Sequence, residues 1–257
     1  MIKAVFFDID GTLLVSGLGT LPASAKKALY DLKKKGILIF IASGRHICEI
    51  QKQPMYDIPF DGYVLLNGQI GLNKQKEVMF EYPIDKRDQL KLIEIFNQKG
   101  ISLMLVEKNR LYINCIKDQV YQAQGNIASE LPIIEKYRGD VLYQATAFVG
   151  EKQAKELMEQ LPYSKMTRWN SYGIDIIAKE GGKKKGIESI LQIYQLSWDE
   201  VMSFGDGEND KEMLLNSKIG VAMQNGNQEV QEVSDYVTAC AEKDGIIKAL
   251  RHFQILP

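Results

Sequence analysis

Continuous apolar runs alternate with helix-like patterns in the first third of the chain. The runs at residues 4–7, 37–42 and 62–66 carry no charged residue. Runs of this length and composition predict strands buried on both faces, as a parallel sheet requires. Between the first two runs, residues 22–35 predict a helix that ends at Gly36 and carries one apolar face: Ala25, Ala28, Leu29 and Leu32.

The same alternation resumes near the end of the chain. Apolar runs at 201–204 and 219–223 predict two more buried strands, and 235–238 predicts a short edge strand. Helices are expected between and after them, at about 184–194, 211–216, 226–233 and 243–253. Alternating strands and helices indicate an α/β fold with a doubly wound parallel-sheet (Rossmann-like) core. Ligands bind beyond the carboxyl ends of the strands of such a sheet.

Residues 81–180 follow a different pattern, because their strands are less uniformly apolar and pair as hairpins. The expected elements are a strand at 78–82, a helix at 85–99, a hairpin at 101–106 and 111–115, a helix at 118–129, a strand at 141–149 and a helix at 151–160, followed by alternating strand character at 168–178. We therefore predict a discontinuous core domain (1–80 and 181–257) with an inserted α+β domain (81–180).

The amino-acid composition excludes several classes of function. The formal net charge is −1, which provides no general attraction to nucleic acid or to anionic membranes. No apolar run approaches the about 18 residues of a membrane span. Three widely spaced cysteines fit reduced thiols, so a cytoplasmic protein is expected. With His46 and His252 as the two histidines, acid–base chemistry is expected from carboxylates, Lys or Tyr.

Candidate chemistry begins where the first strand ends. Asp8 and Asp10 follow the run 4–7 and precede Gly11. Two carboxylates at the mouth of a buried strand are unfavourable unless a cation or hydrogen bonds compensate them. Taken alone, this stretch is better explained as an ordinary solvated turn, since Asp and Gly are common turn residues. The interpretation therefore depends on which other groups can converge on these two acids.

Three other segments offer such groups at strand ends or at a helix start. Ser43 and Gly44 end the second strand, and the run 205–210 contains three acids directly after another strand. Lysines 183–185 open a helix, where positive charge costs some ~0.3–1 kcal/mol against the helix dipole. A lysine at this place is explained if it binds an anion. Carboxylates at 8, 10 and 206 are hard oxygen ligands suited to Mg²⁺.

These segments together resemble the four motifs of the haloacid dehalogenase-like (HAD) hydrolase superfamily. The matching residues are 8–13, Ser43, the pair Lys185–Gly186 and the run 205–210, while 41–45 and 66–68 resemble its Cof-type branch. The inserted domain is similar to a class IIB cap. The resemblance spans almost the whole chain. It favours Lys185 over its two neighbouring lysines, because the family pairs this Lys with Gly.

The resemblance implies a Mg²⁺-dependent phosphatase. Asp8 would attack phosphorus and form an aspartyl-phosphate, and Asp10 would act as general acid and base. Mg²⁺ would be bound by Asp8, Asp206 and the backbone carbonyl of Asp10. The phosphate-binding groups would be Ile9, Ser43, Gly44, Lys185 and Asn209, with Asp210 and Asn67 in support.

The expected substrate is a small phosphorylated metabolite, such as a sugar phosphate or a phosphorylated cofactor or precursor. Arg168, Trp169 and Asn170 of the inserted domain are candidates for substrate contact, although an ordinary exposed strand end explains them equally well. Two alternatives use similar residues. One is a phosphotransferase or mutase with the same chemistry. The other is a phospho-accepting regulatory switch, which needs neither Asp10 nor the inserted domain. The sequence does not indicate the oligomeric state.

Overall fold

The structure is a computed structural model that describes residues 1–125 and 130–257. Its larger sheet has the strand order β13-β12-β11-β1-β2-β3-β4-β5. The first six strands in that order are parallel to their neighbours, and β4 and β5 are added antiparallel. The strands are β1 (Ala4–Phe7), β2 (Leu38–Ala42), β3 (Gly62–Leu65), β4 (Ile70–Asn73), β5 (Val78–Glu81), β11 (Val201–Gly205), β12 (Ile219–Met223) and β13 (Tyr236–Thr238).

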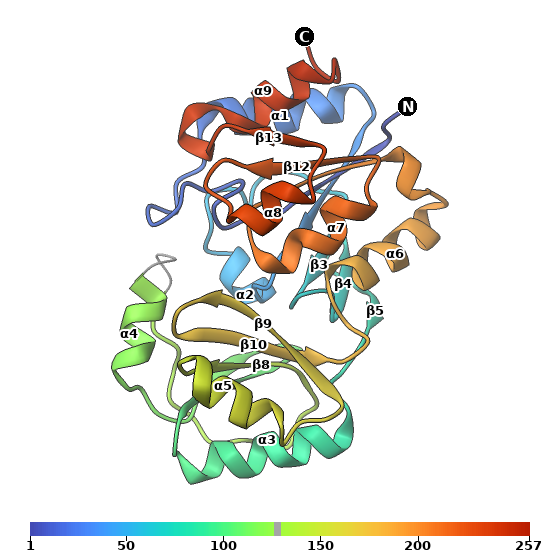
Figure 1. Cartoon of the computed structure of the whole chain (residues 1–257). Coiled ribbons are helices and arrows are strands. Elements are labelled where there is room, and N and C mark those ends of the chain that lie inside the picture. The colour runs from blue at the N-terminus through green and yellow to red at the C-terminus, as the bar shows by residue number, and fades with distance from the viewer. Residues whose placement is uncertain (126–129) are drawn as a thin grey trace.

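Helices cover both faces of this sheet (Figure 1). Successive residues of a strand point to opposite faces, so Val5 and Phe7 pack with α1 (Ala23–Lys34) and α9 (Gly245–His252). Ala4 and Phe6 pack with the helices of the other face: α6 (Lys183–Tyr194), α7 (Lys211–Asn216) and α8 (Gln228–Glu232). Burial on both faces is why these strands are apolar throughout.

The second sheet is antiparallel, with the order β7-β6-β8-β10-β9. Its strands are β6 (Ser102–Glu107), β7 (Leu111–Ile113), β8 (Leu142–Phe148), β9 (Ser164–Asn170) and β10 (Gly173–Ala178). Helices α3 (Lys86–Gln98) and α5 (Glu151–Met158) pack on one face and form a separate apolar core. The other face is turned toward the large sheet, and α4 (Asp118–Gly125) lies at its side (Figure 1).

Short elements complete the described part of the chain. A four-residue helix, α2 (Ile47–Ile50), follows β2. Three 3₁₀ turns are η1 (Trp198–Glu200), η2 (Glu208–Asp210) and η3 (Ala241–Lys243). No helix in the described ranges is both long and apolar enough to traverse a lipid bilayer.

The predicted fold class is confirmed: an α/β protein with a doubly wound, mainly parallel core sheet and an α+β insertion. The stretch 168–178, for which alternating strand character was expected, is divided by a turn after Asn170 between the antiparallel strands β9 and β10. The expected helix 118–129 begins at Asp118, and its last residues, 126–129, lie outside the described residues. The second sheet lies within 81–180, and the boundaries of the inserted domain stay a prediction.

Candidate active site

The carboxyl ends of four neighbouring parallel strands bring the sequence motifs together. In the sheet order β11-β1-β2-β3, Asp206 follows β11, Asp8 follows β1, Ser43 follows β2 and Asn67 lies two residues beyond β3. The register aligns Phe7 with Phe204 and Ile41, so the three following loops leave the sheet at one level. Adjacent parallel strands end at the same edge, and the site is therefore a direct consequence of strand order.

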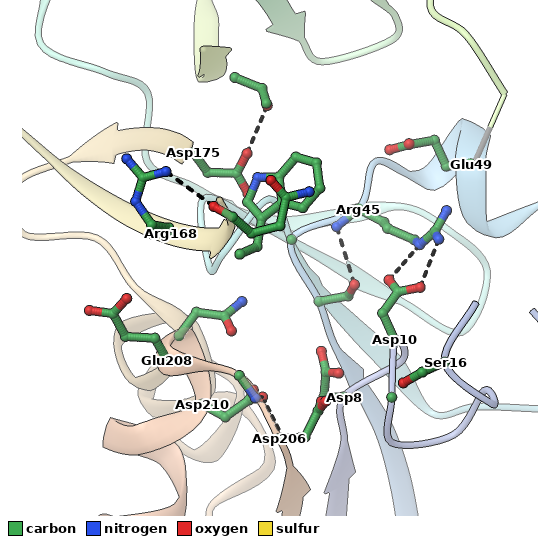
Figure 2. Close-up of a pocket in the computed structure, with 18 of the residues that line it drawn as sticks. Asp8, Asp10, Ser16, Arg45, Glu49, Arg168, Asp175, Asp206, Glu208 and Asp210 are labelled. Atoms are coloured by element: carbon green, nitrogen blue, oxygen red, sulfur yellow. Dashed lines mark hydrogen bonds and ion pairs between the residues drawn. The ribbon is translucent and has the colours of Figure 1, made fainter. Parts of the chain in front are cut away.

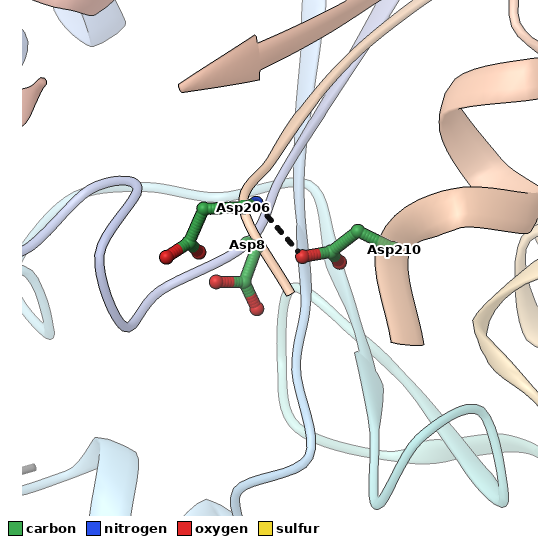
Figure 3. Close-up of side chains that lie close together, drawn as sticks. All are labelled: Asp8, Asp206 and Asp210. Atoms are coloured by element: carbon green, nitrogen blue, oxygen red, sulfur yellow. Dashed lines mark hydrogen bonds between the residues drawn. The ribbon is translucent and has the colours of Figure 1, made fainter. Parts of the chain in front are cut away.

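Three carboxylates gather at this edge (Figure 3). Oxygens of Asp8, Asp206 and Asp210 lie within 4.8 Å of one another. Asp210 is fully buried, and its Oδ2 accepts the backbone N–H groups of Asp206 (3.0 Å) and Gly207 (2.9 Å). The carboxylate of Asp210, the last residue of the 205–210 loop, thus stabilises the tight conformation of that loop.

Asp206 is held by two neutral donors. Thr12 Oγ1 donates to its Oδ1 (3.1 Å), and Asn225 Nδ2 donates to its Oδ2 (2.8 Å). The same amide of Asn225 donates to the backbone carbonyl of Gly11 (3.0 Å), which ties the 8–12 loop to the loop after β12. Thr12 lies within the 8–13 motif but was given no role from the sequence, and Asn225 was not singled out because a lone polar residue in a loop carries no visible signal.

Lys183, not Lys185, is the lysine of the site. The Lys183 ammonium lies 2.6 Å from Asp8 Oδ1 and 2.6 Å from Asp210 Oδ1, and its side chain is fully buried. Lys185 is exposed, with its ammonium 5.8 Å from the centroid of the Tyr82 ring. The prediction of Lys185 is therefore wrong. Two residues along a helix rotate a side chain by about 200°, so the two lysines leave opposite sides of α6.

The acid cluster has the charge balance of a cation site. Burial raises the pKa of Asp8, against the opposing effect of Lys183, and the neighbouring Asp210 raises it further. Burial, followed by Asp8 and Asp210, also raises the pKa of Asp206 well above its usual range. One lysine therefore does not balance three carboxylates, and an additional cation would favour their ionised forms. A hard divalent ion such as Mg²⁺ fits this all-oxygen donor set.

Asp10 is paired with Arg45, the last residue of the run 41–45, for which the sequence pattern indicated no role (Figure 2). Arg45 Nε lies 2.7 Å from Asp10 Oδ2, and Arg45 Nη2 lies 2.7 Å from Asp10 Oδ1. The backbone N–H of Arg45 also donates a hydrogen bond to Ser43 Oγ (3.2 Å). Burial lowers the pKa of Arg45, but its bonds to Asp10 outweigh this effect and raise it. The guanidinium therefore fixes the orientation of the Asp10 carboxylate in a bidentate ion pair.

The remaining predicted residues surround this edge. Asn209 Nδ2 donates to Asn67 Oδ1 (2.8 Å), and a Cβ on Gly44 would lie 3.1 Å from Asn67 Nδ2. Ile9 is buried, and its carbonyl accepts the N–H of Leu14 (2.8 Å), which turns the chain after β1. The structure thus places every predicted site residue except Lys185 at one end of the large sheet.

A cavity of about 370 Å³ opens above these residues, between the two sheets. Its lining includes Asp8, Asp10 and Ser43 from one side and the candidates Arg168, Trp169 and Asn170 from the other. Arg168 is braced by carbonyls, since its Nη1 donates to the carbonyls of Asn170 and Ser171 (3.1 Å each). Gln144, Thr146 and Asp175 also line the cavity. Their signal in the sequence is a polar residue at every second position of an otherwise apolar strand.

Comparisons with known proteins agree with this geometry. The model of the haloacid dehalogenase-like hydrolase family matches residues 5–250. The solved structure of a HAD subclass IIB sugar phosphatase has a TM-score of 0.90 and 32% identity, covering 99% of this chain and 100% of that one.

Two relatives carry provisional phosphatase names. A Bacillus subtilis protein, YkrA, is 26% identical over 99% of this chain and 98% of its own length. A Streptococcus pyogenes protein, provisionally a bifunctional phosphatase and peptidyl-prolyl cis-trans isomerase, is 30% identical over 99% of this chain. That alignment covers 54% of the relative, so this chain spans about half of its length.

Proposed function

Because the chain belongs to the haloacid dehalogenase-like hydrolase family and is a phosphatase of that family, we propose that it hydrolyses small phosphorylated metabolites through an aspartyl-phosphate on Asp8. The substrates would be sugar phosphates or phosphorylated cofactors and their precursors. The observation that carries this proposal is the buried cluster of Asp8, Asp206 and Asp210 around the ammonium of Lys183.

Asp8 is the proposed nucleophile. It lies at the carboxyl end of the central strand β1 and lines the cavity. A carboxylate oxygen would attack phosphorus, and the bond from phosphorus to the leaving oxygen would break. Attack of an anion on a phosphate dianion is opposed by about 4 kcal/mol per charge pair at ~4 Å and an effective dielectric of ~20. Lys183, at 2.6 Å from Asp8, supplies part of the compensating charge.

Mg²⁺ is the proposed cofactor, bound by Asp8, Asp206 and the backbone carbonyl of Asp10. When bound, it would supply positive charge that lowers the repulsion between the Asp8 carboxylate and the phosphate. Asp210 has both oxygens engaged, by Lys183 and by the N–H groups of Asp206 and Gly207. We therefore assign Asp210 to positioning Lys183 instead of binding the metal.

Asp10 is the proposed general acid and base. Its carboxyl group would protonate the leaving oxygen and then take a proton from the water that hydrolyses the aspartyl-phosphate. Arg45 holds this carboxylate at 2.7 Å and keeps it beside the cavity. Ser43, Gly44, Asn209 and Lys183 would hold the phosphoryl oxygens, and Asn67 would support Asn209.

The test is hydrolysis of p-nitrophenyl phosphate by the unaltered protein and by Asp8→Asn. The amide keeps the shape of the side chain but is a poor nucleophile, so we expect turnover to fall to background while circular dichroism remains unchanged. Turnover by the variant at the original rate would refute the assignment. Product analysis with and without a sugar acceptor would distinguish hydrolysis from phosphotransfer.

A further inference from the structure

A polar junction connects the two sheets beside the cavity. Gln144 on β8 and Asp175 on β10 alternate with apolar residues that pack under α3 and α5: Ala145, Ala147, Ile174 and Ile176. Because neighbouring strand residues point to opposite faces, Gln144 and Asp175 point away from those helices and toward the large sheet. Both are buried, at 3% and 8% exposure. The junction is therefore shielded from solvent.

Asn67, in the loop after β3 of the large sheet, forms hydrogen bonds with both Gln144 and Asp175. Its Nδ2 donates to Gln144 Oε1 (3.0 Å) and to Asp175 Oδ2 (2.9 Å), which uses both amide hydrogens. Its Oδ1 accepts from Asn209 Nδ2 (2.8 Å). Asn67 has a φ of +52°, in the left-handed region that Asn tolerates better than most residues. One amide thus connects two strands of the second sheet with a proposed phosphate-binding residue.

A second connection reaches the loop after β2. Gln144 Nε2 donates to the backbone carbonyl of Gly44 (3.3 Å). The fit is close, because a Cβ on Gly44 would lie 3.1 Å from Asn67 Nδ2 and 3.2 Å from Asp175 Oδ2. The phosphate-binding loop at 43–44 thus contacts the second sheet directly, and Asn209 is connected to that sheet through Asn67.

Separation of the sheets would break these bonds together. Asn67 would lose both acceptors of its Nδ2, and the carbonyl of Gly44 would lose its donor. Thr146 Oγ1 donates to Asp175 Oδ1 (2.7 Å) within the second sheet, so one oxygen of Asp175 is satisfied in either arrangement and the other faces Asn67. Buried polar networks of this kind favour one arrangement when they are fully satisfied.

We propose that Gln144 and Asp175 are positioning residues that form a latch. Through Asn67 they hold the inserted domain closed over the cavity, and the same contacts orient Asn209 and the Gly44 loop. Phosphate binding is thereby completed when the domain is closed. The role assigned to Asn209 and Gly44 rests on the proposed function, whereas the latch itself rests on the contacts between the two sheets.

The test compares variants that break the latch with matched controls. Gln144→Met keeps the length of the side chain but removes both of its bonds to the large sheet. Asp175→Ala removes the other acceptor, and Asp175→Asn retains an oxygen that can accept from Asn67. Ser164→Ala is the control, because Ser164 Oγ donates to the buried Asp88 (2.6 Å) inside the inserted region, away from the junction.

Two measurements are needed. The first is the radius of gyration from small-angle X-ray scattering without substrate, which is about 18 Å for a compact chain of this length. We expect it to rise by about 1 Å or more in Gln144→Met and Asp175→Ala, as in a hinge opening. The second is p-nitrophenyl phosphate kinetics, where we expect a raised KM and a kcat lowered by about 10²-fold from misplaced binding groups.

Ser164→Ala should match the unaltered protein in both measurements, and Asp175→Asn should resemble it more closely than Asp175→Ala does. An unchanged radius of gyration in both latch variants would overturn the proposal, and so would equal effects of Ser164→Ala. If the unaltered protein hydrolyses no phosphomonoester, the proposed function fails instead. The scattering experiment still decides the latch, because it does not depend on activity.

Discussion

At the scale of single residues, the ammonium of Lys183 provides the positive charge that pairs with the buried carboxylates Asp8 and Asp210. It lies 2.6 Å from Asp8 and 2.6 Å from Asp210, and it is fully buried. Burial lowers its pKa, but Asp210 and Asp8 outweigh this effect and raise it, so the side chain stays protonated at neutral pH. Lys185, two residues further, has its side chain at the exposed surface of the same helix.

The two lysines therefore offer a matched pair of variants. Lys183→Met should lower kcat for p-nitrophenyl phosphate by about 10²–10³-fold, because a preorganised charge beside the phosphate is lost. It should also destabilise the fold by about 3–5 kcal/mol, since two buried carboxylates lose their partner. Lys185→Met should leave both quantities nearly unchanged. Steady-state kinetics and urea unfolding measure them, and a larger loss in Lys185→Met would contradict the assignment.

Asp175 gives a pH-dependent prediction. Burial raises its pKa from 3.8 to about 6, although hydrogen bonds from Thr146 and Asn67 act in the opposite direction. As pH rises from about 4 to 6, the unfolded chain loses this proton first, so the carboxyl group increasingly destabilises the folded state. The effect is complete above pH about 6 and amounts to about 3 kcal/mol, at about 1.4 kcal/mol per pH unit.

Asp175→Asn removes this ionisation. The free energy of unfolding of the variant, relative to the unaltered protein, should increase by up to about 3 kcal/mol between pH about 4 and pH about 7.5. Urea unfolding at the two pH values provides the comparison. A constant difference between the two proteins would show that Asp175 does not titrate differently in the folded and unfolded states.

At the scale of elements, the start of α6 depends on a close backbone contact. Gly68 follows β3 with a φ of +91°, and a Cβ there would lie 2.0 Å from the carbonyl oxygen of Gly182. Gly182, directly before Lys183, has a φ of +125°. The two glycines let the turn after β3 and the start of α6 approach each other. This close contact places Lys183, the first residue of α6, beside Asp8 at the carboxyl end of β1.

Gly68→Ala tests this contact against Gly36→Ala. Both positions have positive φ, but a Cβ on Gly36 meets no atom within 4 Å. Gly36→Ala should therefore cost only backbone strain, about 1–2 kcal/mol. Gly68→Ala should cost about 1–3 kcal/mol more through overpacking and should also lower kcat, because Lys183 is displaced. Urea unfolding and kinetics measure both effects, and equal losses in the two variants would refute the role of the contact.

At the scale of the whole molecule, two sheets built by different rules enclose one site. The parallel sheet supplies the acids and Lys183 at its carboxyl edge, and the antiparallel sheet supplies the opposite wall of the cavity. The acids cluster because strand order places β11 beside β1. Their repulsion is a cost of the folded state that a bound cation would relieve.

Mg²⁺ should therefore stabilise the entire protein, even without substrate. At 100 times its dissociation constant, an ion that binds only the folded state adds about 2.7 kcal/mol, which raises Tm by roughly 5–10 °C for a chain of this size. EDTA should reverse the shift. Asp206→Asn should abolish it, whereas Glu208→Gln, which alters a cavity acid outside the cluster, should retain it. A Tm that does not respond to Mg²⁺ in the unaltered protein would contradict the metal assignment.

Local patterns in the sequence were sufficient to predict the main strands and where they end. Two examples are the run 4–7, followed by Asp8, and the run 201–204, followed by Gly205 and Asp206. Such runs are visible in the sequence because burial on both faces requires continuous apolar residues. The short β4 was not expected, since it adds antiparallel at the side of the sheet and contains Gly71. The division of 168–178 between two strands was missed because both halves share the same alternation.

By itself, the sequence determined the fold class and which loops carry the candidate acids, because continuous apolar runs and the polar residues that follow them reflect local burial. Tertiary structure decided what depends on the relative placement of distant segments. The choice of Lys183 over Lys185 depends on the rotation of α6 about its axis, which packing sets. The bond from Asn67 to Asp175 joins residues 108 positions apart, and no local pattern specifies such a partner.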